Sequence, residues 1–463
     1  MLFSSMTFIF LFLPIVGLLY LLAKKNKFKN YVLLFTSILF YAWGEPKYLS
    51  IMILTIIINY LGAVGLDKFP KHKKLILTST ILTDLSFLVY FKYFNFIMEN
   101  INTLFTSDFN AIDVVMPIGI SFYTFQAISY LVDVYRGDVK VQKDILKLAL
   151  YICLFPQLIA GPIVQYADVD TQIDEREENF DKVVYGVKRF IFGLAKKVLI
   201  ANTLGAVADK VFADIYNVQT SVAWIGAIAY SFQLFYDFSG YSDMAIGLGS
   251  IFGFKFLENF NYPYISKSIT EFWRRWHISL SSWFKNYLYI PLGGNRKGVK
   301  RTYFNLFIVF LATGIWHGAS WNFIVWGLWH GMFNIIEKLT NWHKKEGKKI
   351  AVIQHIYTLF VVLIGWVMFR ADNLILAKEY IKNMFGLLHN KSSFKVSYFI
   401  DNIEKIAFIA AILCAMPIFK NFAKIQKNKW IHLAINIWII ILFILSVSSI
   451  GTSTYNPFIY FRF

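Results

Sequence analysis

Long apolar runs recur from one end of this chain to the other. Examples are 48–66, 350–370 and 431–450. A helix can cross the hydrocarbon core of a bilayer when it carries about 20 mostly apolar residues, because its backbone polar groups are then satisfied within the segment itself. Repeated runs of this kind exclude the soluble globular classes. They predict an all-α, polytopic membrane protein.

The composition of the chain predicts the same fold class. Of the 463 residues, 57% are hydrophobic and 16% are charged, whereas a soluble domain usually carries about 25% charged residues. The apolar runs predict about 10–13 spans plus re-entrant or interfacial helices. No internal repeat and no polar stretch of domain size is visible, so we expect residues 1–463 to form a single integral-membrane domain.

The positive charge of the chain lies in short segments between the apolar runs. The formal net charge is +18, and lysines cluster at 24–29, 68–74 and 344–349. Short loops rich in Lys and Arg stay on the cytoplasmic side of a membrane. The pattern therefore predicts a multi-pass protein of the cell membrane with an extracytoplasmic N-terminus, and it argues against nucleic-acid binding. A basic cytoplasmic face also attracts anionic lipid headgroups and phosphate-bearing ligands.

Two apolar runs are interrupted by residues that break helices. MPIGISFYTF contains Pro117 and Gly119, and LFPQLIAGPIVQY contains Pro156, Gly161 and Pro162. Irregular backbone at membrane depth survives only where protein or a water-filled cavity covers it. The two runs are therefore either re-entrant elements that line a cavity or ordinary helices kinked at proline.

Three histidines lie in strongly apolar surroundings. His277 follows EFWRRW, His317 follows TGIW and His330 follows WGLW. An imidazole within a bilayer loses its hydration, so such residues are rare unless the protein uses them. The spacings between the three match no short metal-ligand motif, and we expect no metal site.

The surroundings of His317 suit chemistry. A desolvated imidazole stays neutral at pH 7, as a general base must be. The same ring could accept an acyl group as a nucleophile. The alternative is a structural histidine held by hydrogen bonds. For His330 we expect a structural or supporting role.

The segment 271–301 combines tryptophans with basic residues and ends in a glycine-containing turn. Trp prefers the membrane–water interface, and the forked donors of arginine bind phosphate. An interfacial helix that leads to a phosphate-binding turn on the cytoplasmic side would explain this pattern. The alternative is ordinary positive-inside anchoring. The residues concerned are Trp276, Trp283, Arg274, Arg275, Arg296 and Lys297.

The segment 230–247 carries two carboxylates among aromatic residues, Asp237 and Asp243, with Ser242 beside the second. Carboxylates at membrane depth are costly unless they meet a cation or a water-filled path. Asp243 could orient a histidine or receive a substrate hydroxyl, and the alternative is a structural ion pair with Arg274 or Arg275. For Asp237 we favour a structural ion pair with Arg274 or Arg275.

Several stretches together resemble the membrane-bound O-acyltransferase family, and the likeness runs over most of the chain. It is closer to the bacterial polysaccharide O-acetyltransferase branch than to the D-alanyl-transferring teichoic-acid branch. The stretches that carry it are FWRRWHISLSSWFKNYLYIPLGGNR, TGIWHGASWNFIVWGLWHG, MPIGISFYTFQAISYLVDVYRG, LFPQLIAGPIVQY, FSGYSDMAIG and NPFIYFRF.

The resemblance implies an all-helical bundle around a buried funnel or tunnel, with the catalytic segment near residues 230–338. The family's essential histidine corresponds to His317, and a second functional histidine corresponds to His277. The implied acyl donor is acetyl-CoA, entering from the cytoplasm, without a metal. Residues expected at the donor are Arg274, Arg275, Arg296, Lys297 and Trp316. Residues expected to line the tunnel are Asp243, Ser242, Trp276, Trp283, Asn322 and His330.

We therefore expect a membrane O-acetyltransferase that passes acetyl from cytoplasmic acetyl-CoA to an extracytoplasmic polysaccharide, either an exopolysaccharide or peptidoglycan. The implied partners are membrane lipids, a glycan acceptor and a separate extracytoplasmic acyltransferase or polysaccharide-modification protein. Two alternatives stay open. One is a non-catalytic transporter or scaffold of a polysaccharide export complex, which the broken runs would suit. The other is an acyltransferase for a lipid or teichoic-acid-type acceptor.

Overall fold

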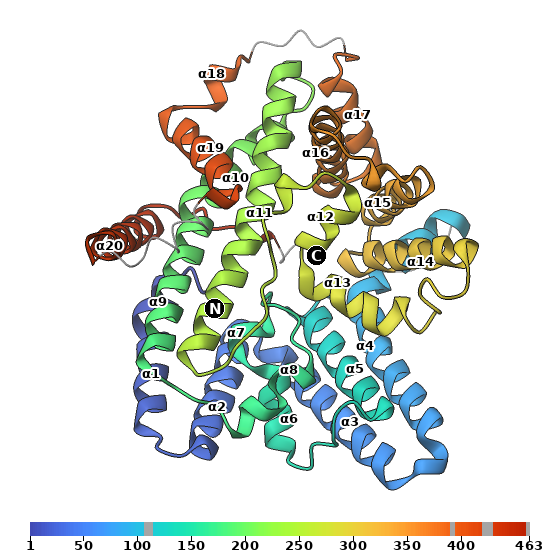
Figure 1. The fold of residues 1–463 in the computed structure, drawn as a ribbon, viewed down its shortest axis with the longest axis vertical. Helices are drawn as coiled ribbons and strands as arrows, with labels where there is room; N and C mark the ends of the chain where they lie inside the picture. Colours follow the sequence, from blue (N-terminus) through green and yellow to red (C-terminus); the bar gives the residue numbers. More distant parts are fainter. Residues whose placement is uncertain (106–113, 389–393, 419–428, 460–463) are drawn as a thin grey trace. The chain divides into compact units, whose positions relative to one another are not determined.

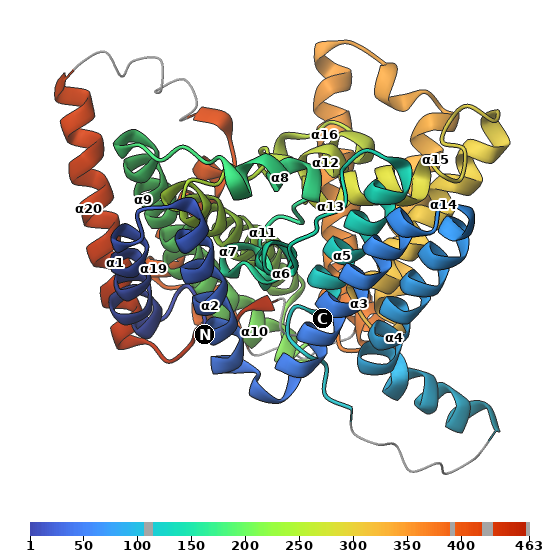
Figure 2. The ribbon, with the colours of Figure 1, turned by 90° about the horizontal axis from the view of Figure 1, so that it is seen from below.

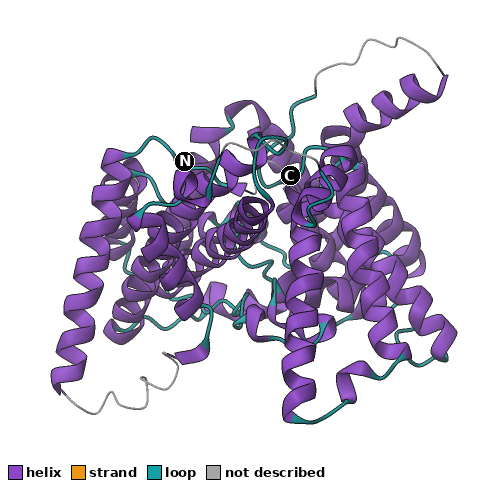
Figure 3. Cartoon of the chain, turned by 90° about the horizontal axis from the view of Figure 1, so that it is seen from above, coloured by secondary structure: helices purple, strands orange, loops and turns teal. Residues whose placement is uncertain are grey.

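The structure is a computed structural model that describes residues 1–105, 114–388, 394–418 and 429–459. Within these ranges the regular secondary structure is helical, apart from an isolated β-bridge between Val218 and Phe394 (Figure 3). The predicted all-α class is confirmed. The last four residues of the stretch NPFIYFRF lie outside the described ranges.

Five helical segments in the described part of the chain are long and apolar enough to cross a membrane. They confirm a multi-pass membrane protein, while the total of about 10–13 spans stays a prediction. In the last of the five, only 11% of the apolar window is buried within the protein, so most of this helix is left to face lipid. The segments are Pro46–Lys68, Pro70–Phe105, Phe180–Ala213, Lys348–Arg370 and Lys429–Thr452.

The two interrupted runs are broken in the structure rather than gently kinked. In the first, Gly119 adopts a left-handed φ of 77°, and the helix begins only at the next residue. The second run divides into two short helices, because Leu154 leaves helical geometry and Pro156 sits in the first turn of the second helix. Proline is tolerated there, since the first amides of a helix have no intrahelical partner.

The chain forms two compact units. The first consists of residues 1–190 and 241–257. In it α3, α4 and α5 pack against one another (Figure 2), and the amide of Asn59 donates to Asp84 Oδ1 at 2.9 Å between α3 and α4. Its helices are α1 (Leu13–Leu22), α2 (Asn26–Gly44), α3 (Leu49–Lys68), α4 (Lys73–Phe105), α5 (Ile120–Arg136), α6 (Ile145–Cys153), α7 (Phe155–Leu158), α8 (Tyr166–Asp174) and most of α9 (Phe180–Ala195).

The second unit consists of residues 191–240 and 258–463. The division between the units falls within α9 and within α11 (Thr220–Ile251). The further helices of the second unit are α10 (Asn202–Ala213), α12 (Ile269–Arg275), α13 (Ile278–Phe284), α14 (Val299–His317), α15 (Trp321–Leu339), α16 (Lys348–Arg370), α17 (Leu374–Met384), α18 (Val396–Phe399), α19 (Asn402–Cys414) and α20 (Lys429–Thr452).

Short polar residues fix where several of these helices begin. The side chain of Asp144 accepts from the amide of Leu146 at the start of α6, and Ser320 does the same for Asn322 at the start of α15. Side-chain oxygens at this position satisfy amides that the first turn leaves without partners. Asp144 and Ser320 are therefore the start signals of α6 and α15.

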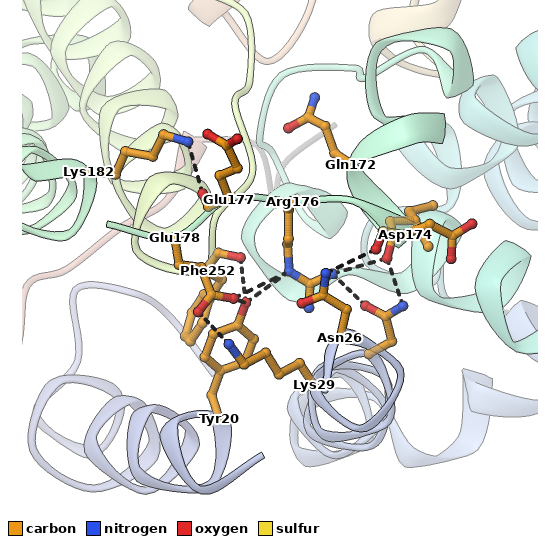
Figure 4. Close-up of polar contacts among 12 residues, drawn as sticks. Tyr20, Asn26, Lys29, Gln172, Asp174, Arg176, Glu177, Glu178, Lys182 and Phe252 are labelled. Atoms are coloured by element: carbon orange, nitrogen blue, oxygen red, sulfur yellow. Dashed lines mark hydrogen bonds and ion pairs between the residues drawn. The ribbon is translucent and has the colours of Figure 1, made fainter. Parts of the chain in front are cut away.

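A buried arginine organises the polar core of the first unit (Figure 4). The Arg176 side chain is fully buried. Its Nε donates to the Tyr20 hydroxyl at 2.9 Å, and its Nη1 donates to Asn30 at 2.6 Å. The Tyr20 hydroxyl in turn lies 2.5 Å from Glu178 Oε1 and 2.8 Å from the carbonyl oxygen of Phe252. One guanidinium therefore ties α1 and α2 to the segment after α8 and to the end of α11.

Replacing Arg176 with Met should destabilise the protein by about 1–3 kcal/mol, because buried oxygens of Tyr20 and Asn30 would lose their donor. Thermal denaturation in one detergent measures the change. The matched control is Lys147→Met, which breaks a pair with Asp174 whose side chains are 30% and 53% exposed. Exposed pairs contribute less than about 1 kcal/mol, so equal effects of the two substitutions would contradict the organising role of Arg176.

Candidate active site

The hairpin of α14 and α15 determines the position of His317 (Figure 1). His317 is the last residue of α14. The two helices approach closely at Gly314 and Gly327: a Cβ on Gly314 would lie 2.4 Å from the carbonyl oxygen of Phe323, and one on Gly327 would lie 2.4 Å from that of Phe310. Only residues without a side chain permit this contact. This close approach of α14 and α15 determines which aromatic rings lie beside His317.

His317 lies in an aromatic chamber. His317 is only 5% exposed. The centroid of its ring lies 5.0 Å from the ring centroid of Trp316, 4.9 Å from that of Trp326 and 5.3 Å from that of Phe369. All three contacts are edge-to-face, the arrangement that aromatic quadrupoles favour. The imidazole therefore points into the second unit and not toward lipid.

His277 belongs to the same chamber. It connects α12 to α13 with a left-handed φ of 44°, which is uncommon outside glycine. Its ring lies 4.5 Å from Phe238 and 6.2 Å from Trp316. Because the indole of Trp316 contacts both imidazoles, the structure brings together His277, Trp316 and His317, three residues that the sequence singled out.

Asn259 fixes the orientation and the tautomer of His277. Its Oδ1 accepts from the amide and the hydroxyl of Ser279 at 3.1 and 2.9 Å, so this atom is the oxygen of the amide. It also lies 3.2 Å from His277 Nδ1. A neutral imidazole must then carry its proton on Nδ1, which leaves the lone pair on Nε2. Burial lowers the pKa of His277 to about 3, so the ring is neutral at physiological pH.

A carboxylate from α15 anchors the helix that leads to His277. Glu337 is fully buried. Its oxygens accept from the amide of Ile269 at 2.6 Å and from the amide and hydroxyl of Thr270, each at 3.1 Å. A negative charge at the start of a helix is stabilising. Glu337 therefore holds the start of α12 against the helix that also carries Trp326 and His330.

His330 lies beside the chamber, and its supporting role stays a prediction. It is fully buried, and its ring packs 5.1 Å from Trp273 and 5.3 Å from Trp326. Neither ring nitrogen has a hydrogen-bond partner among the residues that the structure describes. A Cβ on Gly365 would lie 2.5 Å from its Nε2. Trp326 contacts both His330 and His317, so His330 is in position to support the wall of the chamber.

The basic residues of segment 271–301 are mostly at the surface. Arg274, Arg296 and Lys297 are exposed, whereas Arg275 pairs with Glu271 at 2.8 Å. The turn that carries Arg296 is held from α14, because the amide of Asn305 donates to the carbonyl oxygen of Gly294 at 2.9 Å. Arg296 and Lys297 are therefore available to a phosphate-bearing ligand on a fixed turn, and Arg274 is exposed on α12.

The aspartates of segment 230–247 belong to different units. Asp243 and Ser242 lie in the first unit, where Asp243 pairs with Arg189 at 2.7 Å. Asp237 lies in the second unit and pairs with Lys197 at 2.7 Å, so the expected partner, Arg274 or Arg275, was wrong.

The reason for the Asp237 pairing is local. Lys197 stands on the continuation of α9 with its side chain 3% exposed, and a buried ammonium needs a buried carboxylate. The pair also holds the last described residues, since Asp237 accepts from the amide of Ile459 at 2.8 Å and Lys197 donates to the carbonyl oxygen of Pro457.

The remaining expected residues are dispersed over the second unit. Trp276 packs on Trp366 at 4.9 Å, and Trp283 packs on Tyr287 at 5.3 Å. Asn322 is buried at the start of α15 and lines a small cavity that also reaches Phe369. In the described part of the chain, no three His, Cys, Asp or Glu side chains form a group that could hold a metal ion.

Sequence reasoning missed four residues in and around the chamber: Asn259, Glu337, Phe238 and Phe369. Asn259 lies in an irregular segment, and the aromatic pair lies in runs rich in Phe. Glu337 was the one with a physical hint, because a carboxylate on an apolar helix is costly unless it has donors.

Two comparisons with known proteins identify the family. The model of the family described as "MBOAT, membrane-bound O-acyltransferase family" matches residues 139–371. This stretch contains His277, Trp316 and His317. Relatives match the chain over its whole length. The long apolar helices make this a polytopic membrane protein. The chain belongs to the membrane-bound O-acyltransferase family. It is therefore an O-acyltransferase.

The relatives differ in the acceptor that their names state. A probable alginate O-acetylase AlgI of Pseudomonas putida is 41% identical over the full length of both chains. A peptidoglycan O-acetyltransferase of Helicobacter pylori is 36% identical over 91% of this chain and 87% of its own. A teichoic acid D-alanyltransferase of Bacillus subtilis is 28% identical over 54% of this chain and 68% of its own.

Gly327→Ala should lower both stability and acyl transfer, because the new Cβ would meet backbone atoms of α14 and push His317 away from Trp326. Overpacking of this kind costs about 1–3 kcal/mol. Thermal denaturation and transfer of a labelled acyl group measure the two effects. Gly17→Ala is the matched control, since a Cβ there meets no atom within 4 Å. A Gly327→Ala protein as stable and active as this control would contradict the packing argument.

Asn259→Asp should make the reaction sensitive to acid. A carboxylate accepts the same hydrogen bonds from Ser279, but its charge favours the imidazolium and raises the pKa of His277. As the pH falls through the raised pKa, Nε2 gains a proton and transfer declines, whereas the unmodified ring stays neutral. Rates between about pH 5 and pH 8 test this.

The control for that profile is Asn261→Asp, which adds the same charge at an exposed position two residues away. Superimposable pH profiles for the two variants would show that Asn259 does not set the protonation of His277.

Proposed function

We propose that the chain transfers acetyl from cytoplasmic acetyl-CoA across the membrane for O-acetylation of an extracytoplasmic polysaccharide, an exopolysaccharide or peptidoglycan. The observation that carries this proposal is the placement of two buried imidazoles, His317 and His277, around the indole of Trp316. The names of the relatives, alginate O-acetylase and peptidoglycan O-acetyltransferase, support acetyl as the group and a glycan as the acceptor.

His317 acts as the general base. Its buried ring lacks the hydration that would stabilise a permanent positive charge, so it starts neutral and takes the proton of the acceptor hydroxyl as that oxygen attacks the thioester carbonyl. The C–O bond of the ester forms, the C–S bond breaks, and the proton passes from His317 to the departing sulfur. Coenzyme A leaves as the thiol, and the imidazole is neutral again.

His277 contributes an acceptor rather than a donor. Asn259 holds the proton on Nδ1, so Nε2 offers only a lone pair. That atom accepts a hydrogen bond from an N–H or O–H group of the bound reactants and thereby positions them. It cannot stabilise a developing oxyanion in this tautomer, because such stabilisation needs a donor.

Acetyl-CoA supplies the activated acetyl group as a thioester. The exposed cations Arg274, Arg296 and Lys297 would hold its phosphates, and the distribution of lysine segments supports a cytoplasmic position for that face. Arg275, paired with Glu271, would contribute less, and Trp316 would contact the acyl end. The N-terminus is extracytoplasmic in this arrangement, and residues 1–463 act as one domain in the cell membrane.

The acetyl group is passed outward, directly to a glycan or through an extracytoplasmic acyltransferase. Membrane lipids surround the protein in either case. A teichoic-acid-type acceptor is the second candidate, and the relative of B. subtilis that matches half of this chain favours it less than the full-length relatives favour acetylation of a polysaccharide.

His317→Ala should reduce transfer from labelled acetyl-CoA in proteoliposomes by about 10²–10⁴-fold, the usual contribution of a general base. His72→Ala is the matched control, because this histidine is exposed and far along the chain from the chamber. Turnover by His317→Ala at the rate of the control, with the protein correctly folded, would refute the assignment.

Binding of coenzyme A tests the proposed donor. A ligand that binds the folded state raises its melting temperature. We expect coenzyme A to stabilise both the unmodified protein and His317→Ala. The absence of any shift at saturating coenzyme A would contradict acetyl-CoA as the donor.

A further inference from the structure

The buried stripe of α4 is polar, although protein covers little of this helix. Only 17% of the apolar window in the span that contains α4 is buried. The buried residues follow one another at intervals of one turn and are Thr80, Asp84, Leu88 and Lys92. Apolar side chains can face lipid, whereas polar side chains in a span need partners within the protein. The residues assigned to acyl transfer lie in the second unit, so that reaction leaves this stripe of the first unit without a role.

Asp84 lies deep in its membrane span. It comes 11 residues after Lys73, the first residue of α4, which corresponds to roughly 16 Å of helix and to about half of the hydrocarbon core. It is 1% exposed and forms no ion pair within the described part of the chain. Lys92 lies roughly 12 Å further along the helix axis and donates to the hydroxyl of Ser121 at 3.1 Å. A carboxylate without a cation at this depth would be costly.

Asn59 of α3 is the partner of Asp84. It is fully buried, and its Nδ2 donates to Asp84 Oδ1 and to the carbonyl oxygen of Thr55, each at 2.9 Å. Both of these atoms accept, so the amide atom that meets them is the nitrogen and the orientation of the amide is fixed. Asn59 Oδ1 and Asp84 Oδ2 then have no donor among the described residues. The two residues of one buried pair therefore each carry an unpartnered acceptor.

The hydroxyls around this pair do not supply the missing donor. Thr55 and Thr80 donate to carbonyl oxygens one turn earlier in their own helices, at 3.0 and 2.8 Å, and a hydroxyl has only one proton to donate. Tyr123 of α5 lies within electrostatic range of Asp84, but its hydroxyl makes no hydrogen bond to Asp84 Oδ2. Since buried acceptors are nearly always satisfied, the pair itself must provide a donor or hold a bound species that does.

We propose that Asp84 is a proton-binding site: its carboxyl stays a neutral acid in the folded protein and donates from Oδ2 to Asn59 Oδ1. A single proton then satisfies both unpartnered acceptors. The amide donates to one oxygen of the carboxyl, and the hydroxyl of the carboxyl donates back to the amide, which closes a ring of two hydrogen bonds. This ring joins α3 to α4 within the bilayer without a buried charge. Because both carboxyl oxygens are engaged, the proton is retained and is not passed to a substrate.

A water molecule or a cation between the two oxygens is the alternative. Water donates two hydrogen bonds, and carboxylate and amide oxygens bind hard cations. Either species would leave Asp84 ionised, which distinguishes it from the proposal. The close packing of α3 on α4 disfavours both, because a Cβ on Gly62, one turn from Asn59, would lie 2.8 Å from Thr80 Oγ1.

Infrared difference spectroscopy of the full chain at pH 7 tests the proposal, because a protonated carboxyl has a C=O stretch that a carboxylate lacks. The detergent should contain no ester or acid groups. Subtracting the spectrum of Asp84→Asn from that of the unmodified protein should leave the acid band of one carboxyl per chain. Asp138→Asn is the matched control, since Asp138 is exposed in the same unit and an exposed carboxyl is ionised at this pH. Its difference spectrum should contain carboxylate bands and no acid band.

Two substitutions test the hydrogen bonds of the pair. Asn59→Leu keeps the size of the side chain and removes the amide, so the acid band should remain and move to higher frequency as the C=O group loses its hydrogen bond. Asp84→Asn offers a donor and an acceptor at the same two positions, so its melting temperature should stay close to that of the unmodified protein.

The proposal is overturned if the Asp84→Asn difference spectrum contains only carboxylate bands, the result expected of a bridging water or cation. It is also overturned if the acid band does not move in Asn59→Leu, since the carboxyl would then hold its proton without the amide. A melting temperature of Asp84→Asn far below that of Asp138→Asn would contradict the ring of hydrogen bonds. None of these measurements depends on the acyl-transfer reaction.

Discussion

The close approach of α14 and α15 at Gly314 and Gly327 is the contact on which the candidate site depends. It brings Trp326 to the ring of His317 and places His330 behind that indole. Glu337 lies further along α15 and holds the start of α12, which carries the chain to His277. Two glycines without side chains thus determine the positions of both imidazoles, because each element of the chamber packs on the same helix pair.

The second unit handles buried polarity in three ways. Asp237 and Lys197 neutralise each other and hold the last described residues of the chain. Asn259 uses one oxygen to bind Ser279 and His277 together. Gln233 Oε1 and Asn322 Oδ1 are buried without a hydrogen-bond partner among the described residues. Since polar groups in an apolar interior are costly unless they are partnered, the first two arrangements stabilise the fold.

The sequence predicted the helical membrane class and the family, since apolar length and distinctive motifs are local properties. It did not predict partners distant in the chain. Asp237 was expected to meet Arg274 or Arg275 and instead meets Lys197, because helix packing decides which buried cation lies within reach. Asn259 and Phe369 escaped notice for the same reason. The roles of His317 and His277 in catalysis stay predictions.

The hydrogen-bond network around Arg176 has a consequence for biosynthesis. The hydroxyl of Tyr20 lies beside the carbonyl oxygen of Phe252, a residue 232 positions later in the chain. Contacts so distant in sequence form late, because the intervening chain must first be made and ordered. The first helix is therefore synthesised long before the end of α11, and the contact between Tyr20 and Phe252 can form only after that residue has left the ribosome.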